Sequence, residues 1–176
     1  TLENNTSKKH FQELLDSIDE LEDTNIIFTK ANSDVDGKII NQMINQYTKK
    51  NLKNSIGVAS LGQLKYLSAL QYMDFIIGNS SSGLLEAPSF KIGTINIGDR
   101  QNGRLKAESV IDCSPNKKNI KKAIKKIYSN KFQKILKDVK NPYDNGFVSK
   151  KITKVLKIVK LDKILNKNFF DIKFSL

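Results

Sequence analysis

Apolar residues in the first 115 positions alternate between short continuous runs and runs at helical spacing. Five short runs rich in β-branched residues predict strands, over residues 25–29, 55–60, 74–78, 93–98 and 109–113. Helical spacing predicts amphipathic helices over residues 7–22, from about 36 to 47, and over 61–73, with a short helix over 84–90. Strands that alternate with helices indicate a parallel sheet covered on both faces. We therefore expect an α/β fold with a doubly wound, Rossmann-like parallel sheet.

The remainder of the chain shows helical spacing only. Apolar residues form three stripes, at Ile120, Ile124 and Ile127, at Phe132, Ile135, Leu136 and Val139, and at Val148, Ile152, Val155, Leu156 and Val159. A turn over residues 141–146 separates the last two stripes. The pattern weakens over residues 161–176. We expect one domain over residues 1–160, followed by a C-terminal helix or tail over 161–176 that docks elsewhere.

Length and composition narrow the class of protein. With 176 residues, 39% of them hydrophobic, the chain is long enough to bury a core. Its apolar stretches fall far short of the roughly 20 residues that span a bilayer, and its first residues are too polar for a signal peptide. A single cysteine, Cys113, excludes an internal disulfide and fits a reducing compartment. We expect a cytoplasmic protein without a membrane partner.

The formal net charge of +12 is concentrated in the C-terminal part. From Asn116 onward, 18 lysines stand against four acidic residues. These lysines lie opposite the apolar stripes, as on ordinary solvated helix faces. Because arginines and aromatic residues are not interleaved with them, we do not expect a nucleic-acid partner. A non-catalytic module that binds nucleic acid through its lysine helices is the alternative.

Ligands of doubly wound sheets bind at the carboxyl ends of the strands, so the loops there are the first candidates. The segment NSSSG, residues 79–83, joins a predicted strand to a short helix. Its small residues let a ligand approach the backbone, and the amides of a helix N-terminus favour phosphate. The alternative is an ordinary helix N-cap, for which one serine is enough.

Glu86 lies one turn past Gly83, within the same short helix. A carboxylate there can accept hydrogen bonds from both hydroxyls of a ribose. The alternative is a solvent-exposed acid in the first helical turn, which the helix dipole favours. Considered by itself, the residue fits that alternative better.

Both arginines of the chain, Arg100 and Arg104, lie in the loop after the fourth predicted strand, whereas all other basic residues are lysines. A guanidinium donates two parallel hydrogen bonds to a phosphate or a carboxylate, which an ammonium group cannot do. Gly98 and Gly103 allow the loop to turn tightly around an anion. The alternative is a structural ion pair with a carboxylate such as Asp99.

No metal or cofactor is expected. His10 is the sole histidine and lies on the first predicted helix among polar residues, where a solvent-facing position explains it. One histidine and one cysteine cannot form a zinc site. Asp34 and Asp36 are explained as turn and N-cap residues.

In combination, these segments resemble the C-terminal domain of the hydrolysing UDP-N-acetylglucosamine 2-epimerases, in the branch that feeds sialic and related nonulosonic acid synthesis. The similarity lies within residues 1–115 and is carried by TLENN, FTKANSDVDGKIINQMI, SLGQLKYLSAL, GNSSSGLLEAPSF and GTINIGDRQNGRLKAESVIDC. The resemblance implies two Rossmann-like domains in the GT-B arrangement, of which this chain is the C-terminal half. It also implies a homo-oligomeric parent, and a tail over 161–176 that docks on the N-terminal domain.

The resemblance assigns roles to individual residues, with UDP and a UDP-amino sugar as ligands. Ser80 and Ser81 match the small residues that bind the diphosphate. Arg100, or Arg104 if the loop is aligned the other way, matches the phosphate-binding arginine. Glu86 matches the acid that takes the ribose hydroxyls.

Further residues match positions around the base and along the cleft. Tyr66 falls where an aromatic ring packs on the uracil, and Leu61 where backbone groups read the edge of the base. Asn32, Ser82 and Gly83 match residues that line the cleft.

The family reaction eliminates UDP from the sugar nucleotide and hydrates the resulting glycal to N-acetylmannosamine. Its catalytic residues belong to the first domain, so none is assigned here, and this chain is expected to bind UDP without turning over substrate. N-acetylglucosamine and a 2,4-diacetamido sugar both fit as the sugar. A GT-B sugar-nucleotide glycosyltransferase is the alternative enzyme, because it shares the architecture and often a ribose-binding acid.

Overall fold

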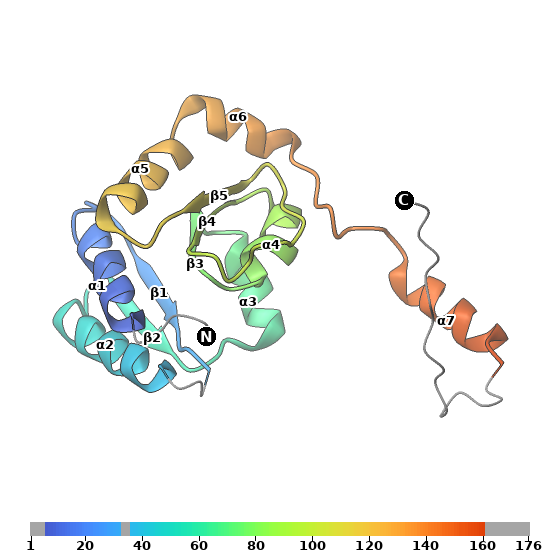
Figure 1. Ribbon diagram of the computed structural model, residues 1–176, viewed down its shortest axis with the longest axis horizontal. Coiled ribbons are helices and arrows are strands. Elements are labelled where there is room, and N and C mark those ends of the chain that lie inside the picture. Colours follow the sequence, from blue (N-terminus) through green and yellow to red (C-terminus); the bar gives the residue numbers. More distant parts are fainter. Residues whose placement is uncertain (1–5, 33–35, 161–176) are drawn as a thin grey trace, which may run out of the picture. The chain divides into compact units, whose positions relative to one another are not determined.

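The computed structural model describes residues 6–32 and 36–160 (Figure 1). The chain forms two compact units, Thr1–Asp144 and Asn145–Leu176. The strands of the larger unit are β1 (Ile26–Thr29), β2 (Ser55–Val58), β3 (Phe75–Gly78), β4 (Gly93–Ile97) and β5 (Val110–Cys113). Its helices are α1 (Ser7–Ile18), α2 (Gly37–Lys50), α3 (Gly62–Leu70), α4 (Ser82–Leu85), the 3-10 helix η1 (Ala87–Phe90), α5 (Lys117–Ile127) and α6 (Asn130–Asp138). The smaller unit contains α7 (Val148–Ile158).

All strand pairs in the described residues are parallel, as predicted. They form two hydrogen-bonded sheets, one of β1 and β2 and one in the order β3-β4-β5, where the sequence suggested a single sheet. One hydrophobic core nevertheless serves both sheets, because Phe28 of β1, Ile95 of β4 and Ile111 of β5 belong to the same buried cluster. The two sheets are therefore held by packing.

Helices α1 and α5 cover the core and pack against each other (Figure 1). Leu14, Leu15 and Ile18 of α1 share the core cluster with Ile120, Ile124 and Ile127 of α5. Polar contacts join the same two helices: the Glu13 carboxylate accepts a hydrogen bond from the Lys117 amide at 2.7 Å. A carboxylate at a helix N-terminus satisfies a free amide and complements the helix dipole.

Strand β4 lies in the middle of its sheet, and alternate residues face opposite sides. Ile95 belongs to the core cluster that contains α5, whereas Thr94 bonds to the start of α4. A second hydrophobic cluster, of Leu70, Ala87 and Ile92, joins α3 to η1. Helices therefore cover both faces of this sheet, and α3 and α4 bring the candidate site to it.

The structure differs from the predicted helices at their ends. The first helix stops at Ile18 and the third at Leu70. The predicted helix over 84–90 consists of two short pieces, α4 and η1, with Pro88 in the first turn of η1. Proline has no amide hydrogen and clashes with the preceding turn, so α4 cannot continue through it.

The turn predicted over residues 141–146 separates α6 from α7, as expected. The larger unit ends at Asp144, and α7 belongs to the smaller one, whereas the sequence prediction carried one domain to residue 160. The predicted tail over 161–176 lies outside the described residues. Within the described ranges, the structure contains no helix long and apolar enough to cross a membrane.

Candidate functional site

The serine turn, residues 79–83, follows β3 at its carboxyl end. Gly78, the last residue of β3, has a φ of 148°, which favours glycine. The Ser80 hydroxyl accepts a hydrogen bond from the Ser82 amide at 3.3 Å, and the Ser81 carbonyl accepts from the amides of Leu84 and Leu85 at 2.9 Å. One serine therefore helps to cap the turn, as the structural alternative required. Ser81 occupies the N-cap position without a side-chain cap bond, so its hydroxyl is left for another partner.

Gly83 is buried against the neighbouring strand. The Thr94 hydroxyl donates to the Gly83 carbonyl at 2.8 Å. A Cβ atom on Gly83 would lie 2.4 Å from the Thr94 methyl carbon, far inside contact distance. Gly83 thus sets how closely α4 approaches β4, and its predicted cleft-lining role stays a prediction.

Tyr66 joins α3 to the serine turn. Its hydroxyl is hydrogen-bonded to the hydroxyl of Ser82, and its ring packs against the cluster of Leu70, Ala87 and Ile92. Burial raises the pKa of Tyr66; the Ser82 hydrogen bond opposes this shift, and the charge of Glu86 adds to it. These three predicted site residues, Tyr66, Ser82 and Glu86, are therefore close neighbours.

Glu86 follows the last residue of α4 and caps its C-terminal end. Glu86 is at the same time the N-cap residue of η1, without a side-chain cap hydrogen bond. A negative charge at a helix C-terminus gains nothing from the dipole. The dipole of α4 therefore gives no reason for a carboxylate at this position, whereas the N-terminus of η1 favours one, so both the ribose role and the structural alternative stay predictions.

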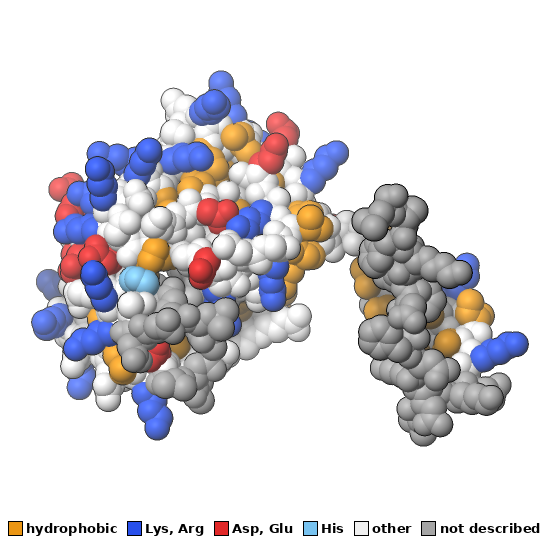
Figure 2. All heavy atoms as spheres, in the orientation of Figure 1, with side chains coloured by type: hydrophobic (Ala, Val, Ile, Leu, Met, Phe, Trp, Pro, Cys, Tyr) orange, Lys and Arg blue, Asp and Glu red, His pale blue; other side chains and the backbone are white. Residues whose placement is uncertain are grey.

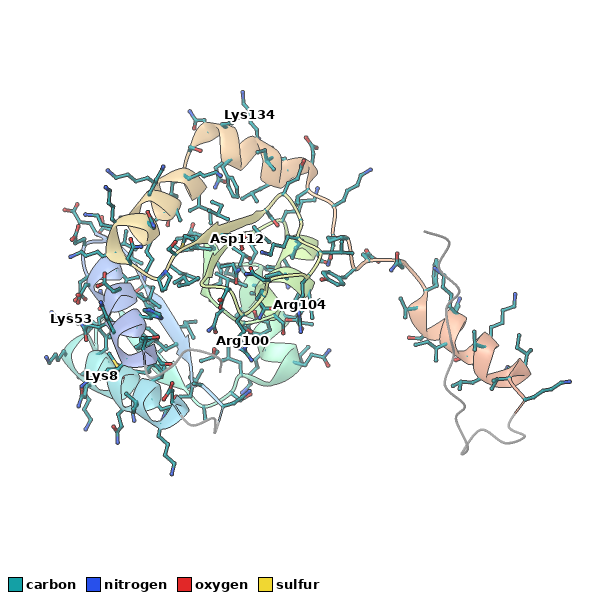
Figure 3. All side chains as sticks on the ribbon, in the orientation of Figure 1. Lys8, Lys53, Arg100, Arg104, Asp112 and Lys134 are labelled. Atoms are coloured by element: carbon teal, nitrogen blue, oxygen red, sulfur yellow. The ribbon has the colours of Figure 1, made fainter. Side chains whose placement is uncertain are left out.

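The arginine loop, residues 98–104, follows β4 at the same edge of the sheet. Gly98 and Gly103 have φ values of 78° and 77°, so both turn the loop as predicted. Arg100 and Arg104 are exposed (Figure 3). Arg100 Nη1 lies 3.5 Å from the carbonyl oxygen of Asn79, a long contact. The ion pairs of the described residues do not join Asp99 to either arginine, which leaves both guanidinium groups for an anion.

Gln101, between the arginines, was not singled out from the sequence. It is only 3% exposed, and its Nε2 donates to the Asn79 carbonyl at 2.7 Å. This bond ties the arginine loop to the serine turn. A polar residue in a polar loop gives no sequence signal of burial, so only the fold shows it.

The turn that follows α6 contacts the chain next to both loops. Asn141 Nδ2 donates to the carbonyl of Leu85 at 2.8 Å and to the hydroxyl of Ser89 at 2.7 Å, on either side of Glu86. The Tyr143 hydroxyl donates to the carbonyl of Leu105 at 3.0 Å, next to Arg104. The turn after α6 therefore fixes the backbone next to both predicted ligand residues.

Two predicted site residues are not joined to these loops by the contacts of the described residues. Leu61 is half-buried at the N-cap of α3, and Asn32 is exposed after β1. The amide of Asn41 holds Ala31, next to Asn32, through hydrogen bonds of 2.8 and 3.1 Å. Their roles in binding a base or lining a cleft stay predictions.

Two surface hollows of the described chain lie away from this site. One runs along α5 and is lined by lysines, Lys117, Lys118, Lys121, Lys122 and Lys125. Figure 2 shows basic side chains gathered over this region with acidic ones beside them, and Glu20 pairs with Lys117 and Lys121.

The described residues contain no group of three His, Cys, Asp or Glu side chains that could hold a metal. Burial raises the pKa of the Cys113 thiol to about 11, which makes it a poor nucleophile.

Comparison with known proteins identifies related sequences along most of the chain. The family model of UDP-N-acetylglucosamine 2-epimerase matches residues 1–157. GDP/UDP-N,N'-diacetylbacillosamine 2-epimerase (hydrolyzing) from Campylobacter jejuni is 44% identical over 98% of this chain and 44% of its own length. Polysialic acid biosynthesis protein P7 from Escherichia coli is 35% identical over the same shares of the two chains. The chain thus spans less than half the length of these relatives.

Solved structures agree on the fold. The UDP-GlcNAc 2-epimerase of Methanocaldococcus jannaschii, crystallised with UDP-GlcNAc and UDP, matches 85% of this chain and 41% of its own, with a TM-score of 0.66 and 22% identity. This likeness confirms the predicted fold class, a Rossmann-like α/β domain of the GT-B type. With the family model matched over residues 1–157, the chain belongs to the UDP-N-acetylglucosamine 2-epimerase family.

Proposed function

We propose that this chain is the UDP-binding half of a hydrolysing UDP-amino-sugar 2-epimerase of the cytoplasm. The observation that carries the proposal is the junction of the two loops at Asn79, whose carbonyl accepts from Gln101 and faces Arg100. It sets an exposed guanidinium beside the serine turn. The proposal needs these groups together, because a diphosphate presents several oxygens to donors from more than one loop.

The diphosphate is assigned to the serine turn and the arginines. Ser81 offers a hydroxyl that caps nothing, and both arginine side chains are exposed. In the proposed reaction, the bond between C1 of the sugar and the β-phosphate oxygen breaks as a proton leaves C2, which gives UDP and a 2-acetamido glycal. Negative charge grows on the leaving diphosphate, so cationic donors aimed at it lower the barrier. Water then adds to the glycal with the opposite configuration at C2.

The nucleoside is assigned to Glu86 and Tyr66. The Glu86 carboxylate lies near the Tyr66 hydroxyl, and the structure gives it no hydrogen-bond donor among the described residues. A carboxylate with free oxygens suits the vicinal hydroxyls of a ribose. The Tyr66 ring is half-buried, and its hydroxyl is held by Ser82, so the ring has a fixed orientation for a base.

For the sugar, the relatives favour a substrate with two acetamido groups. The Campylobacter jejuni relative, at 44% identity, is named for N,N'-diacetylbacillosamine. We therefore assign the full-length parent to a UDP-2,4-diacetamido sugar. Incubating that parent with UDP-N,N'-diacetylbacillosamine and with UDP-N-acetylglucosamine, and following UDP release, tests the choice. Faster release from the second substrate would reverse it.

Calorimetric titration of the purified chain tests the binding proposal. UDP, UMP, uridine and GDP are titrated at two salt concentrations. The expected affinity is highest for UDP, lower for UMP and lowest for uridine, and GDP should bind more weakly than UDP. Added salt should lower the affinity of the phosphate-containing ligands only. Circular dichroism on the same sample reports whether the chain is folded. Absence of UDP binding by a folded chain would contradict the proposal.

A further inference from the structure

Gln101 is a buried amide in an otherwise exposed loop. The side chain is 3% exposed, whereas Arg100, Asn102, Gly103 and Arg104 around it are exposed. Its Nε2 donates to the Asn79 carbonyl at 2.7 Å. The amide orientation is fixed by chemistry, because only the nitrogen end can face a carbonyl oxygen.

The other end of this amide is unsatisfied. Gln101 Oε1 is buried without a hydrogen-bond partner among the described residues. A buried acceptor without a donor costs free energy of folding. An apolar side chain of the same volume would fill the space without that cost. The stabilising role of Gln101 in the fold is therefore weak, and its contribution lies in the bond to Asn79.

That bond acts on the loop that carries the arginines. Arg100 itself contacts the same carbonyl only at 3.5 Å, too long to hold the loop. Gln101 is the next residue, so fixing its side chain fixes the starting point of the Arg100 side chain. An exposed arginine loses rotamer freedom when it binds an anion, which costs conformational entropy. If the backbone that carries it is already fixed, the entropy lost on binding is smaller.

Resting on the proposed function, we propose that Gln101 is a positioning residue for diphosphate binding, which sets the arginine loop against the serine turn by its bond to Asn79. It does not touch the nucleotide. It acts through Arg100, so its effect falls on phosphate-containing ligands and leaves the nucleoside unaffected.

The test compares two amide-to-apolar variants in the same loop. Gln101→Met removes the bond to Asn79, and Asn102→Leu is the control, because Asn102 is exposed and contributes only its backbone amide, to the Asp99 carbonyl at 2.8 Å. UDP and uridine are titrated into the wild-type chain and both variants, and unfolding midpoints are measured in urea. Gln101→Met is expected to lower the affinity for UDP by about three- to tenfold, which corresponds to the loss of one hydrogen bond, and to leave the affinity for uridine unchanged. Asn102→Leu is expected to leave both ligands unchanged.

The outcomes separate the two proposals. If the folded wild-type chain does not bind UDP, the proposed function fails. If it binds UDP and Gln101→Met binds it equally well, or loses UDP and uridine by the same factor, the positioning role is overturned. A second variant, Arg100→Lys/Gln101→Met, adds a check: a loss equal to that of Arg100→Lys alone shows that Gln101 works through the arginine, and additive losses show that it does not.

Discussion

The Thr94 hydroxyl on β4 donates to the Gly83 carbonyl at 2.8 Å, while the Thr94 methyl carbon occupies the space where a side chain on Gly83 would begin. Two elements of the candidate site thus meet at van der Waals distance. The strand sets the position of α4, and α4 sets the position of the serine turn and Glu86.

Gly83→Ala is expected to destabilise the chain by about 1–3 kcal/mol, because the new methyl group would overlap the Thr94 methyl. Thr94→Ser keeps the hydroxyl and removes the methyl, so the double variant should recover most of that loss. Urea unfolding of both single variants and the double variant measures the coupling. Additive losses would show that the two residues do not compete for this space.

Arg100→Lys is expected to lower the affinity for UDP by about five- to tenfold, the affinity for UMP by less, and the affinity for uridine not at all. Lysine keeps the positive charge but cannot donate the two parallel hydrogen bonds of a guanidinium group. Arg104→Lys is the matched variant, four residues along the same loop and also exposed. Calorimetric titration of the three ligands decides which arginine is the main phosphate ligand. An equal loss for all three ligands in Arg100→Lys would remove its phosphate role.

Glu86→Gln is expected to weaken UDP by about three- to tenfold relative to 2′-deoxy-UDP, since a neutral amide accepts more weakly from the ribose hydroxyls. The fold should tolerate the change, because the Glu86 side chain makes no cap hydrogen bond to α4 or η1. The ratio of the two affinities in wild-type and variant chains is the measurement. An unchanged ratio would rule out the ribose assignment.

The lowered pKa of Glu20 should make the stability of the fold depend on pH. Hydrogen bonds from Lys117 and Lys121 lower its pKa from 4.5 to about 2, and they join the segment that follows α1 to α5. Because the folded-state pKa is the lower one, this contribution is complete above about pH 4.5 and is lost as the pH falls through about 2. The pairs are partly exposed, so the contribution is small and weakens with salt.

Thermal unfolding between pH 6 and 2 checks this prediction. Glu20→Gln should show a shallower fall in the unfolding midpoint than the wild-type chain. Glu22→Gln, a nearby exposed change of the same kind, is the control. Parallel curves for wild-type and Glu20→Gln would show that the pairs with Lys117 and Lys121 do not contribute.

The sequence predicted those parts of the fold that depend on local pattern. The run GTINI became β4, and the spacing of Ile120, Ile124 and Ile127 became the buried face of α5. The division of the predicted helix over 84–90 into two short pieces was missed, although Pro88 gives a local reason for it. The number of hydrogen-bonded sheets was not readable, since pairing depends on strands far apart in the chain.

The candidate site was predicted in part for the same reason. Arginine in a lysine-rich chain stands out by residue type, and three serines in a row stand out by repetition. Gln101 and Asn141 do not, because their roles arise from contacts 22 and 56 residues away in the sequence. The ribose role of Glu86 stays a prediction, and its place between α4 and η1 became visible only in the structure.

The contact between Glu13 and Lys117 spans 104 residues of chain. A ribosome adds about 5–20 residues per second, so α1 would wait on the order of 5–20 s before the start of α5 is synthesised. During that time Leu14, Leu15 and Ile18 lack the partner helix that covers them in the native core. In a nascent chain, or in one truncated before Ile127, the apolar face of α1 therefore lacks the α5 side chains that share its cluster, and a helix of 12 residues is only marginally stable without such packing.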